Sequence, residues 1–142
     1  MSETQELLGS LKSLDKEKEL QRYLDNLQTN GYPATFAGYY DYMLKKKDLV
    51  KKDVVAASLL DRVYAYQIIS GIRNAGRDKI FALCLAAGFN LEETQRALEI
   101  AKEGVLYAKN SRDSIIIYAI NNKIDVMHTN FLLEKYKEKI LE

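Results

Sequence analysis

Residues 51–71, KKDVVAASLLDRVYAYQIISG, decide the fold of this chain, because they carry the signals of two short helices joined by a tight bend. The first eight residues fit a helix with its apolar positions on one side. Leu59 and Leu60 form the bend, and Asp61 is a suitable N-cap for a second helix, which we expect to end at Gly71. The side chains predicted to point inward from the first helix are those of Val54, Val55 and Ser58.

The second helix offers one face to a core and one face to solvent. The inward side is predicted to consist of Tyr64, Ala65, Ile68 and Ile69. The outward side is predicted to consist of Arg62, Val63, Tyr66, Gln67 and Ser70. Two short helices at this spacing are typical of a helix-turn-helix, in which a supporting helix crosses the DNA backbone and the next helix presents its N-terminal half to the major groove.

The outward side chains have the chemistry that reading a base sequence needs. Gln67 can bond an adenine edge with both ends of its amide, and Arg62 can bind a guanine or a phosphate. Tyr66 can reach a phosphate or pack on a thymine methyl group. We therefore expect this face to contact DNA.

The totals of the chain limit the classes of protein to which it can belong. A length of 142 residues with 47% hydrophobic residues suits one ordinary core, and the formal net charge of +1 gives no global attraction to nucleic acid. The single cysteine, Cys84, lies in an apolar run and is interpreted as a buried hydrophobe. The first twenty residues do not form a signal peptide, and no apolar run reaches the ~20 residues of a membrane span, so we expect a cytoplasmic protein.

We divide the chain into an N-terminal helical extension, residues 1–34, and an all-α helix-turn-helix domain, residues 35–142. A leucine stripe in the extension needs a partner surface, either another protein or a second copy of the chain; it comprises Leu7, Leu11, Leu14, Leu20, Leu24 and Leu27. Thr35 is a suitable N-cap for the next helix. We interpret as core in that helix Phe36, Tyr39, Tyr40, Tyr42, Met43 and Leu44.

An internal repeat with an offset of 35 residues organises the C-terminal part. Residues 77–98, RDKIFALCLAAGFNLEETQRAL, and 112–133, RDSIIIYAINNKIDVMHTNFLL, both open with Arg-Asp, carry an apolar block and pause at a polar residue. The pause at Asn90, with Glu93, predicts a capping box, and Asp125 predicts a cap with His128 in the reciprocal position. Each unit is therefore predicted to be a helical hairpin, and the two must stack to bury their apolar faces.

The repeated Arg-Asp pair favours a structural role over a phosphate contact. Arg77 and Asp78 follow the candidate recognition helix, but the same pair recurs at Arg112 and Asp113. We interpret both pairs as helix starts, with the aspartate placed favourably in the first turn.

Beyond these patterns, the chain resembles the phage-repressor-like (XRE-like) helix-turn-helix family. In particular, it is similar to a bacterial subgroup that carries, in this order, motifs of the form YAYQIISGIRNAGRDKIFAL (64–83), LEETQRALEIA (91–101) and LYAKNSRDSIIIYAI (106–120). The resemblance covers roughly residues 36–136, and the usual turn glycine and a downstream proline are replaced by Leu59 and Ala75. It implies an all-α DNA-binding transcriptional regulator that binds double-stranded DNA as a homodimer.

The same resemblance assigns DNA contacts residue by residue. Lys51, with its neighbour Lys52, would contact phosphates from the start of the supporting helix, and Arg73 would do so from beyond the recognition helix. Local charge agrees, because residues 43–80 carry nine Lys or Arg against four Asp, a net charge of +5. Lysine runs are also common on solvated helix surfaces, so the charge supports the motif and does not replace it.

Nothing in the sequence predicts catalysis, a metal or a cofactor. The one histidine, His128, has no second histidine or nearby cysteine, and Glu92 and Glu93 are explained as first-turn acids of a capped helix. Glycine-rich phosphate loops are absent from the sequence. We therefore expect a non-enzyme. The alternative to DNA binding is a protein interaction module on a helix-turn-helix scaffold, favoured by Leu59 in the turn and by Asp61, whose charge would face the phosphates.

Overall fold

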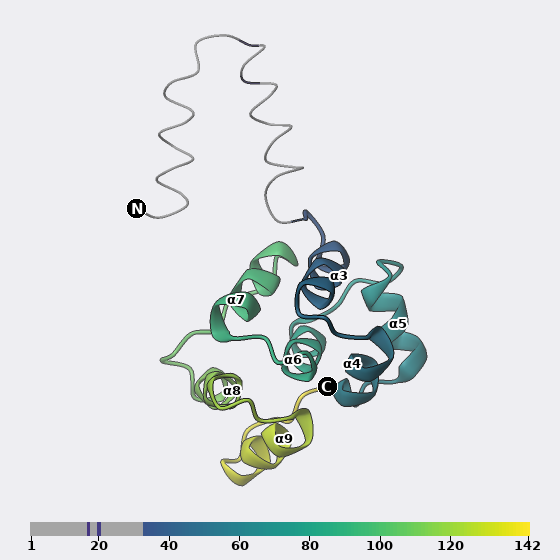
Figure 1. Cartoon of the computed structure of the whole chain (residues 1–142). Coiled ribbons are helices and arrows are strands. Elements are labelled where there is room, and N and C mark those ends of the chain that lie inside the picture. Colours follow the sequence, from purple (N-terminus) through teal and green to yellow (C-terminus); the bar gives the residue numbers. More distant parts are fainter. Residues whose placement is uncertain (1–16, 18–19, 21–32) are drawn as a thin grey trace. The chain divides into compact units, whose positions relative to one another are not determined.

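A computed structural model of the chain describes residues 17, 20 and 33–142 (Figure 1). The chain divides into two units, Met1–Ala34 and Thr35–Glu142, and the elements below belong to the second. Apart from Leu20, the leucine stripe predicted in the extension lies outside the described residues. The helices of the second unit are α3 (Phe36–Lys46), α4 (Lys51–Ser58), α5 (Arg62–Ile69), α6 (Arg77–Ala86), α7 (Leu91–Ile100), α8 (Ser111–Asn121) and α9 (Val126–Lys135).

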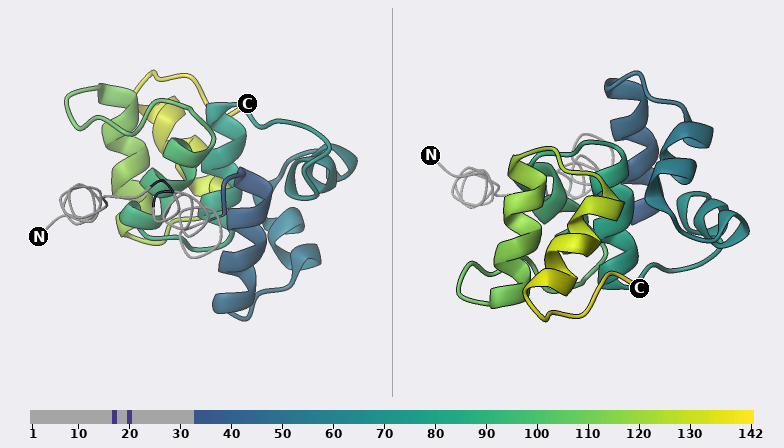
Figure 2. Two further views of the ribbon diagram at one scale, coloured as in Figure 1. Left: turned by 90° about the horizontal axis from the view of Figure 1, so that it is seen from above. Right: turned by 90° about the horizontal axis from the view of Figure 1, so that it is seen from below.

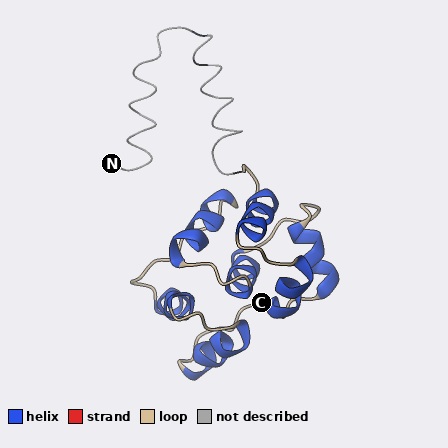
Figure 3. Cartoon of the chain, viewed as in Figure 1, coloured by secondary structure: helices blue, strands red, loops and turns tan. Residues whose placement is uncertain are grey.

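The predicted all-α class is confirmed, since the described residues form helices and loops without a strand (Figure 3). Helix α6 lies at the centre, with α3, α4, α7, α8 and α9 arranged around it (Figures 1 and 2). Six consecutive residues of α6, 80–85, are buried, as expected for a central helix that is apolar on every side. Cys84 is among them, and burial raises the pKa of its thiol far above the usual range.

Helix α3 forms where the cap and the apolar spacing predict it. The Thr35 hydroxyl accepts a hydrogen bond from the Gly38 N–H at 3.1 Å. The predicted core positions Phe36, Tyr39, Tyr40, Met43 and Leu44 are buried, but the prediction for Tyr42 was wrong, because its side chain is 45% exposed. The buried positions repeat at intervals of three and four, and position 42 falls outside that stripe on the helix surface.

Helices α4 and α5 and the bend between them have the predicted form. Val54, Val55 and Ser58 of α4 are buried. Leu59 turns the chain with φ 60° and ψ 12°, in the left-handed region. The Asp61 carboxylate then accepts a hydrogen bond from the Tyr64 N–H at 3.0 Å and starts α5, whose buried residues are Ala65, Ile68 and Ile69. After α5 the chain reverses at Gly71, where φ of 85° favours glycine.

The repeat forms two helical hairpins, α6–α7 and α8–α9. The predicted capping box at Asn90 and Glu93 is complete, with hydrogen bonds of 2.8 and 2.9 Å between each side chain and the other residue's backbone N–H. Asp125 caps α9 as predicted, by accepting from the His128 N–H at 2.8 Å. The reciprocal bond differs, because the His128 ring contacts the Asp125 carboxylate at 2.6 Å rather than the backbone N–H of the cap residue.

The two hairpins are tied together by crossed ion pairs, which corrects the interpretation of the Arg-Asp motifs as helix starts alone. Arg77 donates two hydrogen bonds to the Asp113 carboxylate, at 2.9 and 2.8 Å. Arg112 does the same to Asp78, at 3.0 and 2.8 Å. Because each arginine binds the aspartate of the other repeat, the hairpins are related by an approximate two-fold axis.

Backbone contacts extend this symmetry past the residues in which the sequence repeat is visible. Arg77 donates to the carbonyls of Gly104 and Val105, at 2.7 and 2.9 Å. One repeat later, Arg112 donates to the carbonyls of Lys139 and Ile140, at 2.8 and 3.2 Å. Each hairpin thus holds the extended segment that follows it, and the structural repeat covers residues 77–107 and 112–142.

Candidate nucleic-acid interface

The face of α5 predicted to read bases points away from the core. Arg62, Val63 and Ser70 are exposed, whereas Tyr66 and Gln67 are partly buried. Tyr66 packs against the edge of the hydrophobic core, and the Arg62 guanidinium lies over its ring at 5.8 Å from the centroid. Both aromatic packing and the cation contact hold Tyr66 and Arg62 near one another on the surface.

These five predicted side chains line one open groove of about 400 Å³. A sixth lining residue, Ile72, was not predicted from the sequence and has 78% of its surface exposed. Ile72 follows the Gly71 reversal, where helical periodicity no longer indicates which side a residue faces. A large exposed apolar residue directly after a helix stop is the sequence signal that could have found it.

A hydrogen bond joins Gln67 and Arg73, two residues that are predicted to have separate roles in DNA binding. The Nε of Arg73 donates to the side-chain oxygen of Gln67 at 3.0 Å. The Arg73 guanidinium also lies 4.6 Å from the centre of the Tyr64 ring, and Lys79 approaches the same ring at 5.4 Å. Tyr64 is partly buried against the core, so its predicted inward placement is confirmed in part. Arg73, Lys79 and Gln67 therefore form a polar cluster beside the groove.

The start of α4 combines two exposed lysines with an uncapped helix end. Val50, the N-cap residue, provides no side-chain hydrogen bond to the first turn, and Lys51 and Lys52 are both exposed. The first backbone N–H groups of a helix have no partner within the helix, and they attract anions. This end of α4 therefore has the donors that a phosphate contact requires.

An acidic side chain of α3 competes for one of these lysines. The Asp41 carboxylate lies 3.0 Å from the Lys45 ammonium and 3.5 Å from that of Lys51. The hydrogen bond from Lys45, with the charges of both lysines, holds the pKa of Asp41 below its usual range. These ion pairs are exposed, so each is worth only about 0–1 kcal/mol, and a phosphate can displace Asp41 from Lys51.

Fewer basic side chains are available near the α5 face than the nine Lys and Arg of residues 43–80 would suggest. Arg77 is bound to Asp113, and Lys47 pairs with Glu93 of α7 at 3.0 Å. Both cations are thus engaged with the hairpins rather than with the α5 face. The remaining basic residues of that segment are Lys45, Lys46, Lys51, Lys52, Arg62, Arg73 and Lys79.

Exposed apolar side chains accompany the polar ones on this part of the domain. Leu59 in the bend is 61% exposed, and Val63 on α5 is 65% exposed. With Ile72, they give this part of the domain a mixed character, since Val63 and Ile72 line the groove together with Arg62 and Gln67. Such a surface can pack on thymine methyl groups and sugars, or on another protein.

The described residues contain neither of two features that would indicate other functions. No three His, Cys, Asp or Glu side chains in residues 33–142 are grouped as a metal site would require. Among the helices that the structure describes, none is long and apolar enough to cross a membrane.

Comparison with known proteins adds no relative: no protein-family model matches the chain, and neither a curated protein nor a solved structure shows significant similarity to it.

Proposed function

We propose that residues 35–142 bind double-stranded DNA and regulate transcription, with α4 as the supporting helix and α5 as the recognition helix. The observation that carries this proposal is the groove on α5, whose lining consists of the five predicted base-reading side chains and Ile72. The exposed lysines Lys51 and Lys52 lie at the start of α4, and Arg73 lies past the end of α5. These groups can bind phosphates on either side of the α5 face.

The bond between Gln67 and Arg73 defines how the amide can be used. A bidentate contact with adenine uses both ends of the Gln67 amide, so Arg73 would have to release the oxygen and turn to a phosphate. The alternative is a single bond from the amide NH₂ group to a base acceptor, with Arg73 keeping the oxygen in place. In the first case Arg73 acts as a phosphate ligand, and in the second it acts as a positioning residue for Gln67.

Selection of bound sequences from a random duplex pool tests the proposal. On a selected duplex, Arg62→Ala and Gln67→Ala should each weaken binding by about tenfold or more, because each removes a base or phosphate contact. The melting temperature should stay unchanged, since neither side chain belongs to the buried core. Lys109→Ala is the control: it removes the charge of an exposed lysine between α7 and α8 and should leave affinity unchanged.

The lysines of α4 give a second readout. Lys51→Ala should weaken all duplexes alike and reduce the slope of log affinity against log salt by about one unit, because a phosphate contact releases one counterion. A loss that depends on the base sequence would contradict the phosphate role. Failure to bind any duplex at low salt would end the proposal as a whole.

A protein-binding role for the same face is the second candidate. It is favoured by the exposed Leu59, Val63 and Ile72 and by Asp61, whose carboxylate at the start of α5 would repel phosphates. Association through this apolar surface should barely respond to salt, whereas DNA binding should fall steeply as salt rises. We further propose that the DNA-bound form is a homodimer on two half-sites, which the stoichiometry of the complex measures.

A further inference from the structure

The two hairpins, although related by symmetry, differ in what covers them. In the first hairpin, helix α3 lies against α7 and the turn before it. The Tyr40 hydroxyl donates to the Leu83 carbonyl at 2.7 Å, and the Tyr39 hydroxyl donates to the Glu93 carbonyl at 3.0 Å. Both tyrosine rings also contact the Phe89 ring, with centroids 6.2 and 5.6 Å apart. An aromatic-faced helix thus fills the space between α6 and α7.

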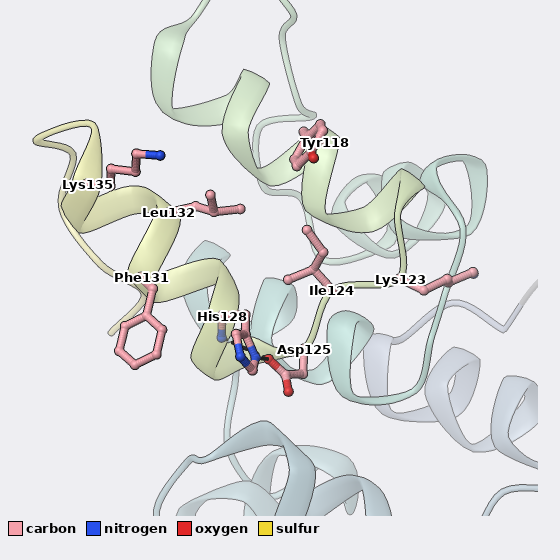
Figure 4. A pocket seen from close by; sticks show the side chains of 8 residues that line it. All are labelled: Tyr118, Lys123, Ile124, Asp125, His128, Phe131, Leu132 and Lys135. Atoms are coloured by element: carbon pink, nitrogen blue, oxygen red, sulfur yellow. Dashed lines mark hydrogen bonds and ion pairs between the residues drawn. The ribbon is translucent and has the colours of Figure 1, made fainter.

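The corresponding space in the second hairpin is open. One repeat after Leu83, Phe89 and Glu93 come Tyr118, Ile124 and His128. All three line a groove of about 550 Å³ between α8 and α9, together with Lys123, Asp125, Phe131, Leu132 and Lys135. Tyr118, Ile124 and Leu132 point into the space between the helices, whereas Lys123 points away from it (Figure 4).

Two aromatic side chains of this groove are unusually exposed for a hairpin interior. Tyr118 is 54% exposed and Phe131 is 58% exposed, although their counterparts Leu83 and Arg96 are buried and partly buried. The His128 ring contacts the Phe131 ring edge-on, with centroids 5.8 Å apart. Exposed aromatic side chains that converge on one concave surface mark a protein interaction site.

The charges at the rim indicate which helix would fit. In the first hairpin, the Lys47 ammonium at the end of α3 pairs with Glu93 at 3.0 Å. In the second hairpin, His128 replaces that glutamate, and Lys135 stands where the first has Ile100. Asp125 and Phe131 stand where the first has Asn90 and Arg96, and Lys123 stands where it has Gly88, so the lining as a whole gains one positive charge. Its one carboxylate, that of Asp125, is already in contact with the His128 ring at 2.6 Å. An occupant should therefore carry acid where α3 carries lysine.

We propose that the α8–α9 groove is a docking site for an amphipathic helix of a partner protein, with an aromatic apolar face and acidic residues at the end that meets His128. The helix lies on the second hairpin as α3 lies on the first, with hydroxyl groups bonded to the carbonyls of residues 118 and 128. This docking site is separate from the α5 groove and does not depend on DNA binding.

A pair of helical peptides tests the proposal on the full chain. Both have the sequence of residues 35–47 and are held helical by a lactam bridge between the side chains of Asp41 and Lys45, which already lie 3.0 Å apart in α3. One keeps the natural lysines, and the other carries Lys46→Glu and Lys47→Glu. Fluorescence anisotropy of labelled peptide measures binding. The acidic peptide should bind saturably and about fivefold more tightly than the natural one.

Variants of the chain locate the binding. Tyr118→Ala should weaken the acidic peptide by about tenfold, as loss of an aromatic contact at an interface centre does. Tyr107→Ala removes a tyrosine that is exposed to a similar extent, 59% against 54%, but lies outside the groove, and it should have no effect. His128→Glu restores the residue type of the first hairpin and should reverse the preference between the two peptides. It keeps the Asp125 cap, because that bond uses the backbone N–H of residue 128.

Three results would overturn the proposal. The first is the absence of saturable binding by the acidic peptide. The second is binding that Tyr118→Ala leaves unchanged while the variant melts at the wild-type temperature. The third is a dimer of the chain, seen by sedimentation, that Tyr118→Ala dissociates, because a second copy would then occupy the groove.

Discussion

Leu59, in the bend between α4 and α5, has a backbone conformation that is unfavourable for a leucine. With φ at 60°, it occupies the left-handed region that an L-residue other than glycine enters at a cost of about 1–2 kcal/mol. Its side chain is 61% exposed, so packing offsets little of that cost. The sequence allowed this strain to be predicted, because the resemblance places a glycine at the same position.

Replacing Leu59 should therefore stabilise the domain. We expect Leu59→Gly to raise the free energy of unfolding by about 0.5–1 kcal/mol, since relief of strain exceeds the entropy that glycine adds to the unfolded chain. Urea unfolding at neutral pH measures the change. Leu60→Gly is the matched control: Leu60 packs against the core and has no positive φ, so it should destabilise. A loss of stability in both variants would mean that the Leu59 side chain contributes packing that outweighs its strain.

The contact between Gln67 and Arg73 marks the limit of prediction at the residue scale. Their separate assignments follow from periodicity and from resemblance, which are local signals. The bond between them spans the end of α5 and the reversal at Gly71, so it depends on a backbone path that periodicity does not describe. For the same reason the sequence did not place Ile72 in the groove.

Individual helices were predictable because their start signals are local. Thr35, Asp61, Asn90 and Asp125 each accept the capping hydrogen bond that a polar residue before an apolar periodic segment predicts. The apolar stripe of α3 predicts its five buried residues, whereas the separate prediction that Tyr42 belongs to the core was wrong, because Tyr42 lies off that stripe. Spacing decides burial on a helix with one covered face.

The relation between helices was less accessible than the helices themselves. The repeat predicted two hairpins that stack, and the structure has them. It did not predict that α3 would cover one hairpin and leave the equivalent groove of the other open. In the sequence α3 is followed by α4 and α5, and no local signal indicates that it packs against α7. The open groove between α8 and α9 is thus a property of the arrangement in space.

At the scale of the domain, the crossed ion pairs connect residues 34–36 positions apart. The repeated Arg-Asp motif pointed to a structural role, but the partner of each arginine follows only from the two-fold stacking of the hairpins. Asp113 is buried and also accepts the Tyr107 N–H at 2.9 Å, so it joins both repeats and the segment between them. Such a group affects the stability of the whole unit.

The titration of Asp113 gives this contact a measurable signature. Burial alone raises the pKa of its carboxyl, but the hydrogen bonds from Arg77 and Tyr107 and the charges of Arg77 and Arg112 outweigh burial and hold the pKa below its usual range. A carboxyl whose folded pKa is lowered stabilises the fold above its unfolded value of about 4. That contribution is lost as the pH falls through the folded pKa.

Asp113→Asn should consequently destabilise the domain by about 2–3 kcal/mol at pH 7, because it leaves Arg77 without its ionic partner. The difference from the wild type should narrow as the pH falls below about 4, where the wild-type carboxylate also takes up a proton. Urea unfolding at pH 7, 5 and 3 measures this convergence. Asp53→Asn, at an exposed first-turn acid of α4, should change stability by less than about 0.5 kcal/mol at neutral pH. An Asp113→Asn deficit that stays the same from pH 7 to pH 3 would show that the aspartate acts through its shape and neutral hydrogen bonds, and not through its charge.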